Sequence, residues 1–522
     1  MFGNCVSQAL ECMRQEKKVY KDYIPSNAID IGNRLFNISK NLWDDVKEKI
    51  CKLLLEEIPY NYPYPTVWWY SVICAIDKNP RIYCDFVKYV RKKQEKFSLN
   101  TLFYLYYQFK SIAFTSSDVD GYEGKVELWK LYLDIIEKYK REVSVSLEKI
   151  PVDKRNNDLV IVITEQFISI EHGPTKTALD RCKAIMTKLN KRVILINTAE
   201  VLSIVGEIPF CDANMGAYMP QIINDRYQEW KGGQIPFIQC KQDMPNINTI
   251  NEILSLIREL APSRIVSIGG SSVVSNLANM IVPAITVGLG PADLEYTTNA
   301  FQTLSRPIND VDRKMLLELG FMEGHVIESV FTSSLKPQAE KISKADLNIP
   351  ADSFLLIVVG ARLNQEVTDE FLRTMNEIVR GNMILGFLGK FGDYDTKISK
   401  YSNLSKHSRF FGFCDDILSR MEVCDLYVNP YRKGGGTSCV EAMYMGVPVV
   451  TCEYGDVSVN VGEEFWVKDY SEMKEKILQY YNDKTYYSIM SDKAKKRTEI
   501  LLDTEGEFVR ILDEVNKREA LL

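Results

Sequence analysis

The sequence predicts an α/β protein in which two Rossmann-like domains follow an all-helical region. Three observations predict this arrangement. Apolar side chains recur at helical spacing through residues 1–155, apolar strands alternate with helices through residues 156–340, and the alternation repeats through residues 341–480. Residues 481–522 are predicted to add C-terminal helices. At roughly 150 residues a domain, the chain is long enough for three or four such units.

The composition is that of a soluble globular protein, with 46% hydrophobic and 26% charged residues. The net charge of −6 argues against a nucleic-acid-binding surface. The 12 cysteines are scattered and there are only 3 histidines, so neither a disulfide framework nor a zinc site is predicted. Reduced cysteines indicate a cytoplasmic protein. No apolar run reaches the roughly 18 residues of a membrane span.

Residues 1–155 are rich in aromatic side chains, most densely at Tyr60–Tyr70 and Phe103–Tyr107. We interpret them as packing between helices. The alternative is a surface that stacks on a sugar or contacts a partner, which would make this region the contact of a homo- or hetero-oligomer. Asp118 and Asp120 have the Asp-x-Asp spacing of some metal sites, but no strand precedes their polar loop. We therefore predict a solvated turn there and no metal site.

The first α/β segment opens with the buried strand Leu159–Ile163, a helix and the strand Arg192–Asn197. This order predicts a parallel sheet with a right-handed crossover. Ligands of open α/β sheets bind at the carboxyl ends of strands, so His172, which precedes the helix, is a candidate catalytic residue. Lys176 is a comparable candidate for contact with a phosphate or an acceptor.

A similar pattern of strand, glycines and helix recurs later in the same segment. Gly269 and Gly270 follow an apolar strand, and Ser272 can cap the next helix. We expect this loop to line the same cleft as His172. The alternative is helix capping with no contact to a ligand.

The second α/β segment begins with the apolar run Phe354–Gly360, predicted to be a central parallel strand. Its most informative stretch is Cys424–Val450, which indicates a strand, a glycine loop, a helix and a strand. The glycines at Gly434–Gly436 let the backbone take positive φ and approach a ligand. Thr437 or Ser438 is expected to cap the helix.

This glycine loop predicts a phosphate site. A loop that leads into a helix N-terminus offers N–H groups and the positive end of the helix dipole, and both favour phosphate. Glu441, expected in the first turn of the helix, could reach a ribose hydroxyl beside the phosphates. The alternative is a capping box, in which Ser438 and Glu441 satisfy N–H groups of the helix itself.

The stretch GGGTSCVEAMYMGVPVVT, from Gly434 to Thr451, resembles the signature of GT-B glycosyltransferases, the group that includes sucrose and glycogen synthases. The resemblance extends upstream to about Phe354. It implies two Rossmann-like domains that face each other across a cleft, with the last helix bracing back on the first domain. It also implies a nucleotide-sugar donor, bound mainly by the second domain.

The resemblance assigns roles to individual residues. Glu441 would hold the ribose of the donor, and Arg362 would bind its diphosphate. Gly412 and Phe413 would frame the base of the donor. The backbone amides of the loop would face the diphosphate and sugar, namely those of Gly434, Gly435, Gly436, Thr437 and Ser438.

The sequence departs from the family pattern at two places. Lys433, with His172 a candidate catalytic residue, stands where the family has a glutamate that contacts the donor sugar. We expect this lysine to meet a phosphate as a point charge. The lysine that the family places a few residues after the diphosphate-binding arginine is missing. Its neighbourhood is occupied by Asn364, Gln365 and Glu366.

We therefore expect a glycosyltransferase that needs no metal and no other cofactor. It would move a hexosyl or N-acetylhexosaminyl group from a nucleotide sugar, UDP-linked by expectation, to a protein, glycan or lipid-linked acceptor. The resemblance alone implies retention of configuration. Loop amides and Arg362 would neutralise the leaving diphosphate, and domain closure would bring His172 and the Gly269–Ser272 loop over the sugar.

Two other classes of function stay open. The first is a catalytically inactive GT-B protein that acts as a partner or co-chaperone of another glycosyltransferase, which Lys433 and the missing lysine suggest. The second is a sugar-nucleotide epimerase, which would need carboxylates in the cleft, and Glu171 and Glu328 are the candidates.

Overall fold

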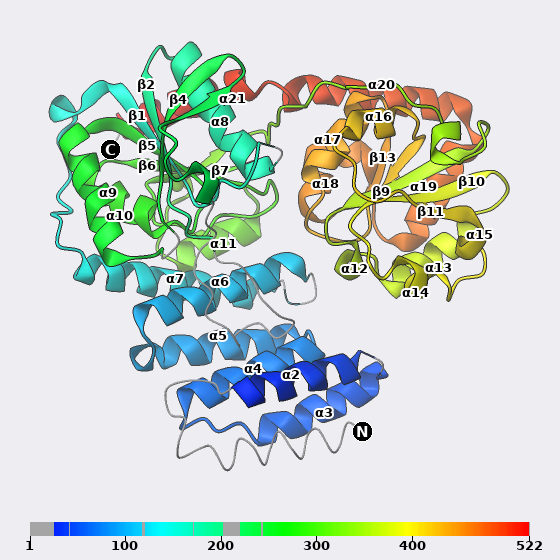
Figure 1. The fold of residues 1–522 in the computed structure, drawn as a ribbon, viewed down its shortest axis with the longest axis horizontal. Helices are drawn as coiled ribbons and strands as arrows, with labels where there is room; N and C mark the ends of the chain where they lie inside the picture. Colours follow the sequence, from blue (N-terminus) through cyan, green and yellow to red (C-terminus); the bar gives the residue numbers. More distant parts are fainter. Residues whose placement is uncertain are drawn as a thin grey trace.

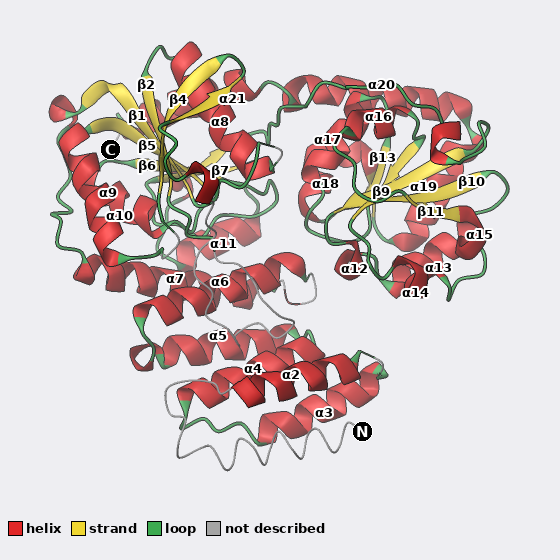
Figure 2. Ribbon diagram, in the orientation of Figure 1, coloured by secondary structure: helices red, strands yellow, loops and turns green. Residues whose placement is uncertain are grey.

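The structure, a computed structural model, describes residues 26–520 except 41, 117–118, 120, 171, 202–219 and 242–243. It has a helical region and two sheet domains that lie side by side above it (Figure 1). Each sheet is flanked by helices (Figure 2). The predicted class, a helical region followed by two Rossmann-like domains, is confirmed. No helix among the residues described here combines the length and the apolar character needed to cross a membrane.

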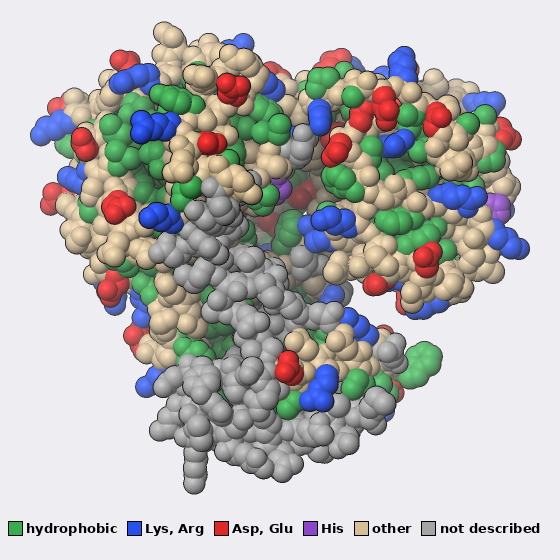
Figure 3. Space-filling view, in the orientation of Figure 1, with side chains coloured by type: hydrophobic (Ala, Val, Ile, Leu, Met, Phe, Trp, Pro, Cys, Tyr) green, Lys and Arg blue, Asp and Glu red, His purple; other side chains and the backbone are tan. Residues whose placement is uncertain are grey.

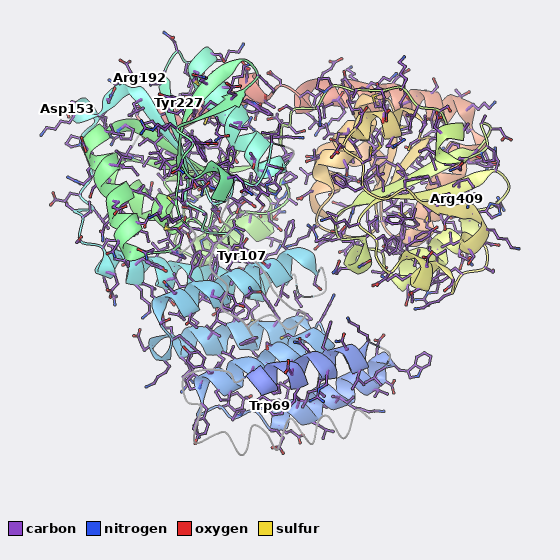
Figure 4. The ribbon with its side chains drawn as sticks, in the orientation of Figure 1. Trp69, Tyr107, Asp153, Arg192, Tyr227 and Arg409 are labelled. Carbon is purple, nitrogen blue, oxygen red and sulfur yellow. The ribbon has the colours of Figure 1, made fainter. Side chains whose placement is uncertain are left out.

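Six α-helices make up the described part of the helical region: α2 (Ser26–Ser39), α3 (Asp44–Glu56), α4 (Pro63–Ile76), α5 (Pro80–Lys92), α6 (Leu99–Thr115) and α7 (Tyr122–Glu142). Its aromatic side chains mostly form the core, as Trp68, Trp69 and Tyr106 are fully buried, with Trp69 labelled inside the stack in Figure 4. Helix packing therefore accounts for them. Asp118 and Asp120, predicted to lie in a turn, fall outside the described residues.

Among its described residues, the first sheet domain has eight strands in the order β3-β4-β2-β1-β5-β6-β7-β8. All neighbours are parallel except the β3–β4 hairpin. Its elements are β1 (Asn156–Thr164), α8 (Gly173–Thr187), β2 (Arg192–Asn197), β3 (Tyr227–Trp230), β4 (Gly233–Gln239), α9 (Ile247–Leu260), β5 (Pro262–Ile268), α10 (Val273–Ile281), β6 (Ala284–Val287), β7 (Phe301–Leu304), α11 (Asp310–Glu318) and β8 (Val326–Glu328).

The helical region is fused to this domain by a shared hydrophobic core. Aromatic residues of α6 and α7 belong to the same buried cluster as Ile161 of β1 and Leu277 of α10. Trp129 of α7 packs on the Tyr296 ring, with centroids 5.8 Å apart. The helical region and the first sheet are therefore held in a fixed relation, which brings α6 close to the ends of the strands.

The second sheet domain has six strands, all parallel, in the order β11-β10-β9-β12-β13-β14. Its elements are β9 (Phe354–Gly360), α12 (Leu363–Glu366), α13 (Asp369–Ile378), β10 (Met383–Gly389), α14 (Tyr394–Ile398), α15 (Leu404–His407), β11 (Ser408–Phe410), α16 (Ile417–Glu422), β12 (Leu426–Val428), α17 (Gly436–Tyr444), β13 (Val449–Cys452), α18 (Gly455–Val461), β14 (Trp466–Val467) and α19 (Tyr470–Asn482).

The last two helices divide between the two sheet domains. α20 (Lys484–Leu501) packs on α17 and α18 of the second domain, whereas α21 (Thr504–Glu519) packs on α8 of the first. Phe508 lies in the core of the first domain, and Arg181 donates a hydrogen bond of 3.0 Å to the Thr504 carbonyl. The chain thus crosses between the domains twice, and the second crossing fixes α21 to the first sheet (Figure 1).

Candidate active site

A cleft of about 810 Å³ lies between the two sheet domains. Loops that follow β1, β6, β9 and β12 line it, together with one side of α6. Figure 3 shows the molecule hollowed between these domains. Strand order reverses at β1 in the first sheet and at β9 in the second. Open α/β sheets bind ligands at such points.

Most of the site residues predicted from sequence line this cleft: His172, Arg362, Phe413, Lys433, Gly434, Gly435, Gly436, Thr437, Ser438 and Glu441. Gly269, Gly270 and Gly412 are not among the lining residues. Lys176 lies in an adjoining cavity of about 100 Å³, which shares Thr437 with the cleft.

The glycine loop turns the chain sharply into α17. Gly435 is the N-cap residue and has a φ of 101°, a left-handed conformation that favours glycine. A Cβ atom there would lie 2.7 Å from a nitrogen of Arg432, so the loop also needs the missing side chain. The prediction that Thr437 or Ser438 caps the helix is wrong, because the helix begins earlier. The Ser438 hydroxyl instead donates to the Gly435 carbonyl at 3.1 Å.

The N-terminus of α17 is open to the cleft. Its first residues, Gly436, Thr437 and Ser438, all line the cavity. The first N–H groups of a helix have no acceptor within the helix, and they carry the positive end of its dipole. The arrangement suits a phosphate or diphosphate group.

Glu441 lies in the second turn of α17, not in the first. The capping-box interpretation is wrong, because the N-cap is Gly435 and has no side-chain bond. Glu441 is 9% exposed and lines the cleft. Burial raises the pKa of its carboxyl to about 7, and Lys176 offsets only part of this. A ligand that donates hydrogen bonds to the carboxylate would stabilise its charged form.

Two arginines lie beneath and beside the glycine loop. Arg432 is buried and pairs with Glu366 at 2.6 Å, while its other nitrogens bond to Asn429 and to the Val359 carbonyl. It therefore supports the loop from inside. Arg362, at the cleft wall, pairs with the other oxygen of Glu366 at 2.9 Å. One carboxylate thus holds both guanidinium groups.

Arg362 also joins the second domain to the helical region. Its guanidinium lies over the ring of Phe114 in α6, 4.9 Å from the centroid. Within the described residues its Nε atom is buried and has no hydrogen-bond partner. An incoming anion could take a hydrogen bond from this side chain.

Lys433 crosses the cleft to the first domain. Its ammonium lies 3.1 Å from the Asp293 carboxylate, in the loop after β6. Lys125 of α7 reaches the same carboxylate at 2.8 Å. Burial opposes the charged form of Asp293, but the two ammonium groups outweigh it and hold the pKa of that carboxyl below its ordinary value.

His172 is the N-cap residue of α8 and contributes no side-chain bond to the helix. Among the described residues its Nδ1 atom is buried without a partner. Burial lowers the pKa of the imidazole, so the ring is neutral near neutral pH. A neutral imidazole on the cleft wall can accept a proton from a bound hydroxyl.

Two carboxylates of the protein itself accept hydrogen bonds from the Gly269–Ser272 loop and the start of α10. Glu165 accepts a hydrogen bond from the Ser271 amide at 3.0 Å, and Glu200 accepts one from Val273 at 2.8 Å. A Cβ atom on Gly269 would lie 2.6 Å from Glu165. The expectation that this loop lines the cleft is therefore wrong, since Glu165 stands between the loop and the cavity.

The remaining predicted positions lie at the edge of the site or away from it. The Gly412 carbonyl accepts from the Gly389 amide at 2.7 Å, which turns Phe413 outward, where it is 70% exposed at the cleft. Glu328, a candidate for an epimerase, does not line the cleft and accepts a hydrogen bond from Ile308 instead. Glu171 falls outside the described residues.

Sequence reasoning missed several charged residues of the cleft, notably Glu165, Lys110, Asp293 and Asp456. Glu165 directly follows β1, so the strand-end rule that selected His172 also applies to it. Burial raises the pKa of Asp456 to about 7, and the charge of Asp293 adds to that effect.

Comparison with known proteins identifies the fold and one domain. Residues 339–497 match the family described as glycosyl transferases group 1. An O-GlcNAc transferase mutant of Thermobaculum terrenum is similar with a TM-score of 0.56 and 12% identity, over 99% of this chain and 97% of that one. A glycosyltransferase from Rickettsia africae is similar with a TM-score of 0.51 and 11% identity, over 70% of this chain and 99% of that one. No curated protein matches.

Proposed function

We propose that the protein transfers a sugar from a nucleotide sugar, UDP-linked, to an acceptor hydroxyl or amide in the cleft. The match of residues 339–497 to glycosyl transferases group 1 and the GT-B fold support this proposal. One observation carries the proposal. The open N-terminus of α17 and the buried carboxyl of Glu441, which has no hydrogen bond within the described residues, lie on the same helix and face the same cavity.

The donor would lie along α17 and the strand ends of the second domain. Its diphosphate would meet the first amides of α17 and the cations of Arg362 and Lys433. Negative charge builds on this leaving group as the glycosidic bond breaks, so fixed N–H groups and cations lower the barrier. Glu441 would accept hydrogen bonds from the ribose, and Phe413 would contact the base.

The acceptor would enter from the side of the first domain and α6. His172 and Glu165 lie on that side of the cleft, and either could take the proton that the acceptor loses. We propose no metal or other cofactor, because helix amides and cations already face the diphosphate. Retention of configuration and the hexosyl or N-acetylhexosaminyl group stay predictions from the resemblance. Cys439 and Cys452 are buried free thiols of the second domain, which suits a reducing compartment such as the cytoplasm.

The experiment is a turnover assay on the full chain with UDP-glucose, UDP-N-acetylglucosamine and their GDP and ADP analogues. We expect release of nucleoside diphosphate from one base family, and loss of that release in Glu441→Ala. Release that is equal for all bases, or unchanged in the variant, would contradict the proposal.

A second candidate function is a GT-B protein that binds the nucleotide without turning it over. One observation favours it: Glu366 pairs with both Arg362 and Arg432, so a carboxylate competes with the diphosphate for the cation beside it. Calorimetric binding of UDP without release of UDP from any sugar donor would support this candidate over the first.

A further inference from the structure

One side of α6 forms a wall of the cleft. Tyr107, Lys110, Ser111 and Phe114 all line it, and their spacing of three, four and seven residues places them on one face of the helix. Figure 4 labels Tyr107 on α6, where the helical region meets the sheet domains. The helical region therefore contributes to the cleft itself.

Lys110 is linked to Glu165 through Ser271. Its ammonium donates to the Ser271 hydroxyl at 2.6 Å, and the Ser271 amide donates to the Glu165 carboxylate at 3.0 Å. The Tyr106 hydroxyl lies 2.8 Å from the same serine oxygen. A single buried serine thus links a cation of the helical region to a carboxylate at the end of β1.

Glu165 is 3% exposed and still lines the cleft. Burial raises the pKa of its carboxyl and the nearby Glu295 adds to this, while Lys110 and the hydrogen bond from the Ser271 amide offset only part of the rise. The other groups that face it are Glu200 and the phenols of Tyr106, Tyr107 and Tyr132. Since these neighbours are acids or neutral phenols, Lys110 supplies the positive charge that favours an ionised carboxylate.

We propose that Lys110 is a positioning residue of the transfer reaction, which holds Glu165 ionised and in place so that Glu165 can accept the acceptor's proton. This rests on the proposed function. As the acceptor oxygen bonds to the anomeric carbon, its proton passes to the Glu165 carboxylate. The bond from the anomeric carbon to the diphosphate oxygen breaks, and its electron pair leaves with the nucleoside diphosphate. The helical region is then a required part of the active site.

The test compares Lys110→Met, Lys110→Arg and the control Lys130→Met, which removes a lysine of α7 outside the cleft. UDP release from UDP-glucose and UDP-N-acetylglucosamine, with water as acceptor, is measured against pH. Lys110→Met should move the acid limb upward by about 1 pH unit. On that limb the rate would then fall about tenfold. Lys110→Arg should restore the profile, and UDP affinity should stay within about twofold. An unchanged profile in Lys110→Met would overturn the proposal.

If the full chain releases no UDP from either donor, the proposed function fails and the linkage is tested by stability alone. Lys110→Met should then lose stability relative to the parent as pH rises above the ordinary range of glutamate. In the Glu165→Gln background this pH-dependent loss should disappear. An equal loss in both backgrounds would show that Lys110 does not act on Glu165, and would overturn the inference independently of activity.

Discussion

The ammonium of Lys433 lies 3.1 Å from the carboxylate of Asp293, so an ion pair joins the glycine loop of the second domain to the first domain across the cleft. Lys125 of the helical region bonds to the same carboxylate. All three parts of the protein therefore meet at one side chain, directly beside the proposed diphosphate site. Binding of an anion there must compete with Asp293 for Lys433.

That competition predicts opposite effects of the two partners on UDP binding. Lys433→Met should weaken binding about tenfold, since a charge-assisted hydrogen bond contributes about 1.5 kcal/mol. Asp293→Asn should leave the affinity equal or tighter, because Lys433 loses its internal partner. Titration calorimetry with UDP measures both. Equal affinity of the parent and Lys433→Met would place the phosphate elsewhere.

Gly435→Ala should disrupt the site more than its strain alone would. Gly435 has positive φ and its added Cβ would lie 2.7 Å from Arg432, so we expect a loss of about 2 kcal/mol or more in stability. UDP binding should be lost as well. Gly462→Ala is the matched control, because Gly462 has a φ of +88° and nothing within 4 Å. Urea denaturation and UDP calorimetry of both variants separate the backbone strain from the clash between the new Cβ atom and Arg432. Similar losses of stability in Gly435→Ala and Gly462→Ala would count against an effect of the clash.

Glu441→Gln should change stability in a pH-dependent manner. Burial raises the pKa of Glu441 from 4.5 to about 7, so the folded protein holds this proton more tightly than the unfolded chain does. The stability that the protonated carboxyl contributes is fully present below about pH 4.5, and it is lost as the pH rises through about 7. The glutamine variant should therefore gain about 3 kcal/mol at about pH 8 and almost nothing near pH 4.5.

Denaturant titrations at these two pH values test that prediction. Burial also raises the pKa values of Asp456 and Glu200 to about 7, and both groups titrate alike in the parent and the variant. The difference in unfolding free energy between the two proteins therefore reports on Glu441 alone. A variant that is less stable than its parent at the higher pH would show that the carboxylate is stabilised by the fold itself.

Glu366→Gln should separate support of the loop from binding of the diphosphate. The change removes the charge that pairs with buried Arg432 and should cost about 2 kcal/mol of stability. It also removes the carboxylate that holds Arg362, so UDP should bind more tightly. Urea unfolding measures the loss of stability, and titration with UDP measures the change in affinity. An unchanged affinity would show that Glu366 does not compete with the diphosphate.

Local patterns were enough to predict the two sheets and most of the residues that line the cleft in the second domain. Buried strands such as Leu159–Ile163 and Phe354–Gly360 lie at the centres of the two sheets, because a continuous apolar run suits a strand covered on both faces. The glycine loop and Glu441 were predicted to lie together for a different reason, and both line the cleft. Their spacing is fixed within a single strand–loop–helix unit.

The wall of the cleft formed by α6 and the first domain could not be predicted, because it depends on contacts between distant parts of the chain. Lys110 and Phe114 reach the cleft only through packing of α6 on the first sheet. The helix cap was assigned to Thr437 or Ser438 because side-chain caps are the commoner choice, whereas a glycine with positive φ takes that place. The Gly269–Ser272 loop was misjudged because its Ser271 amide bonds to Glu165 and its Ser272 hydroxyl to Glu200, and both glutamates are far away in sequence.

The most direct test of the donor site is calorimetric titration of the full chain with UDP, alongside Glu441→Ala and the control Glu328→Ala, which removes a carboxylate outside the cleft. Parent and control should bind UDP with the same affinity, and at a hundredfold excess over Kd the ligand should stabilise the fold by about 2.7 kcal/mol. Glu441→Ala should remain folded and lose this binding. Equal binding by Glu441→Ala, or no binding of UDP by the parent, would contradict the account.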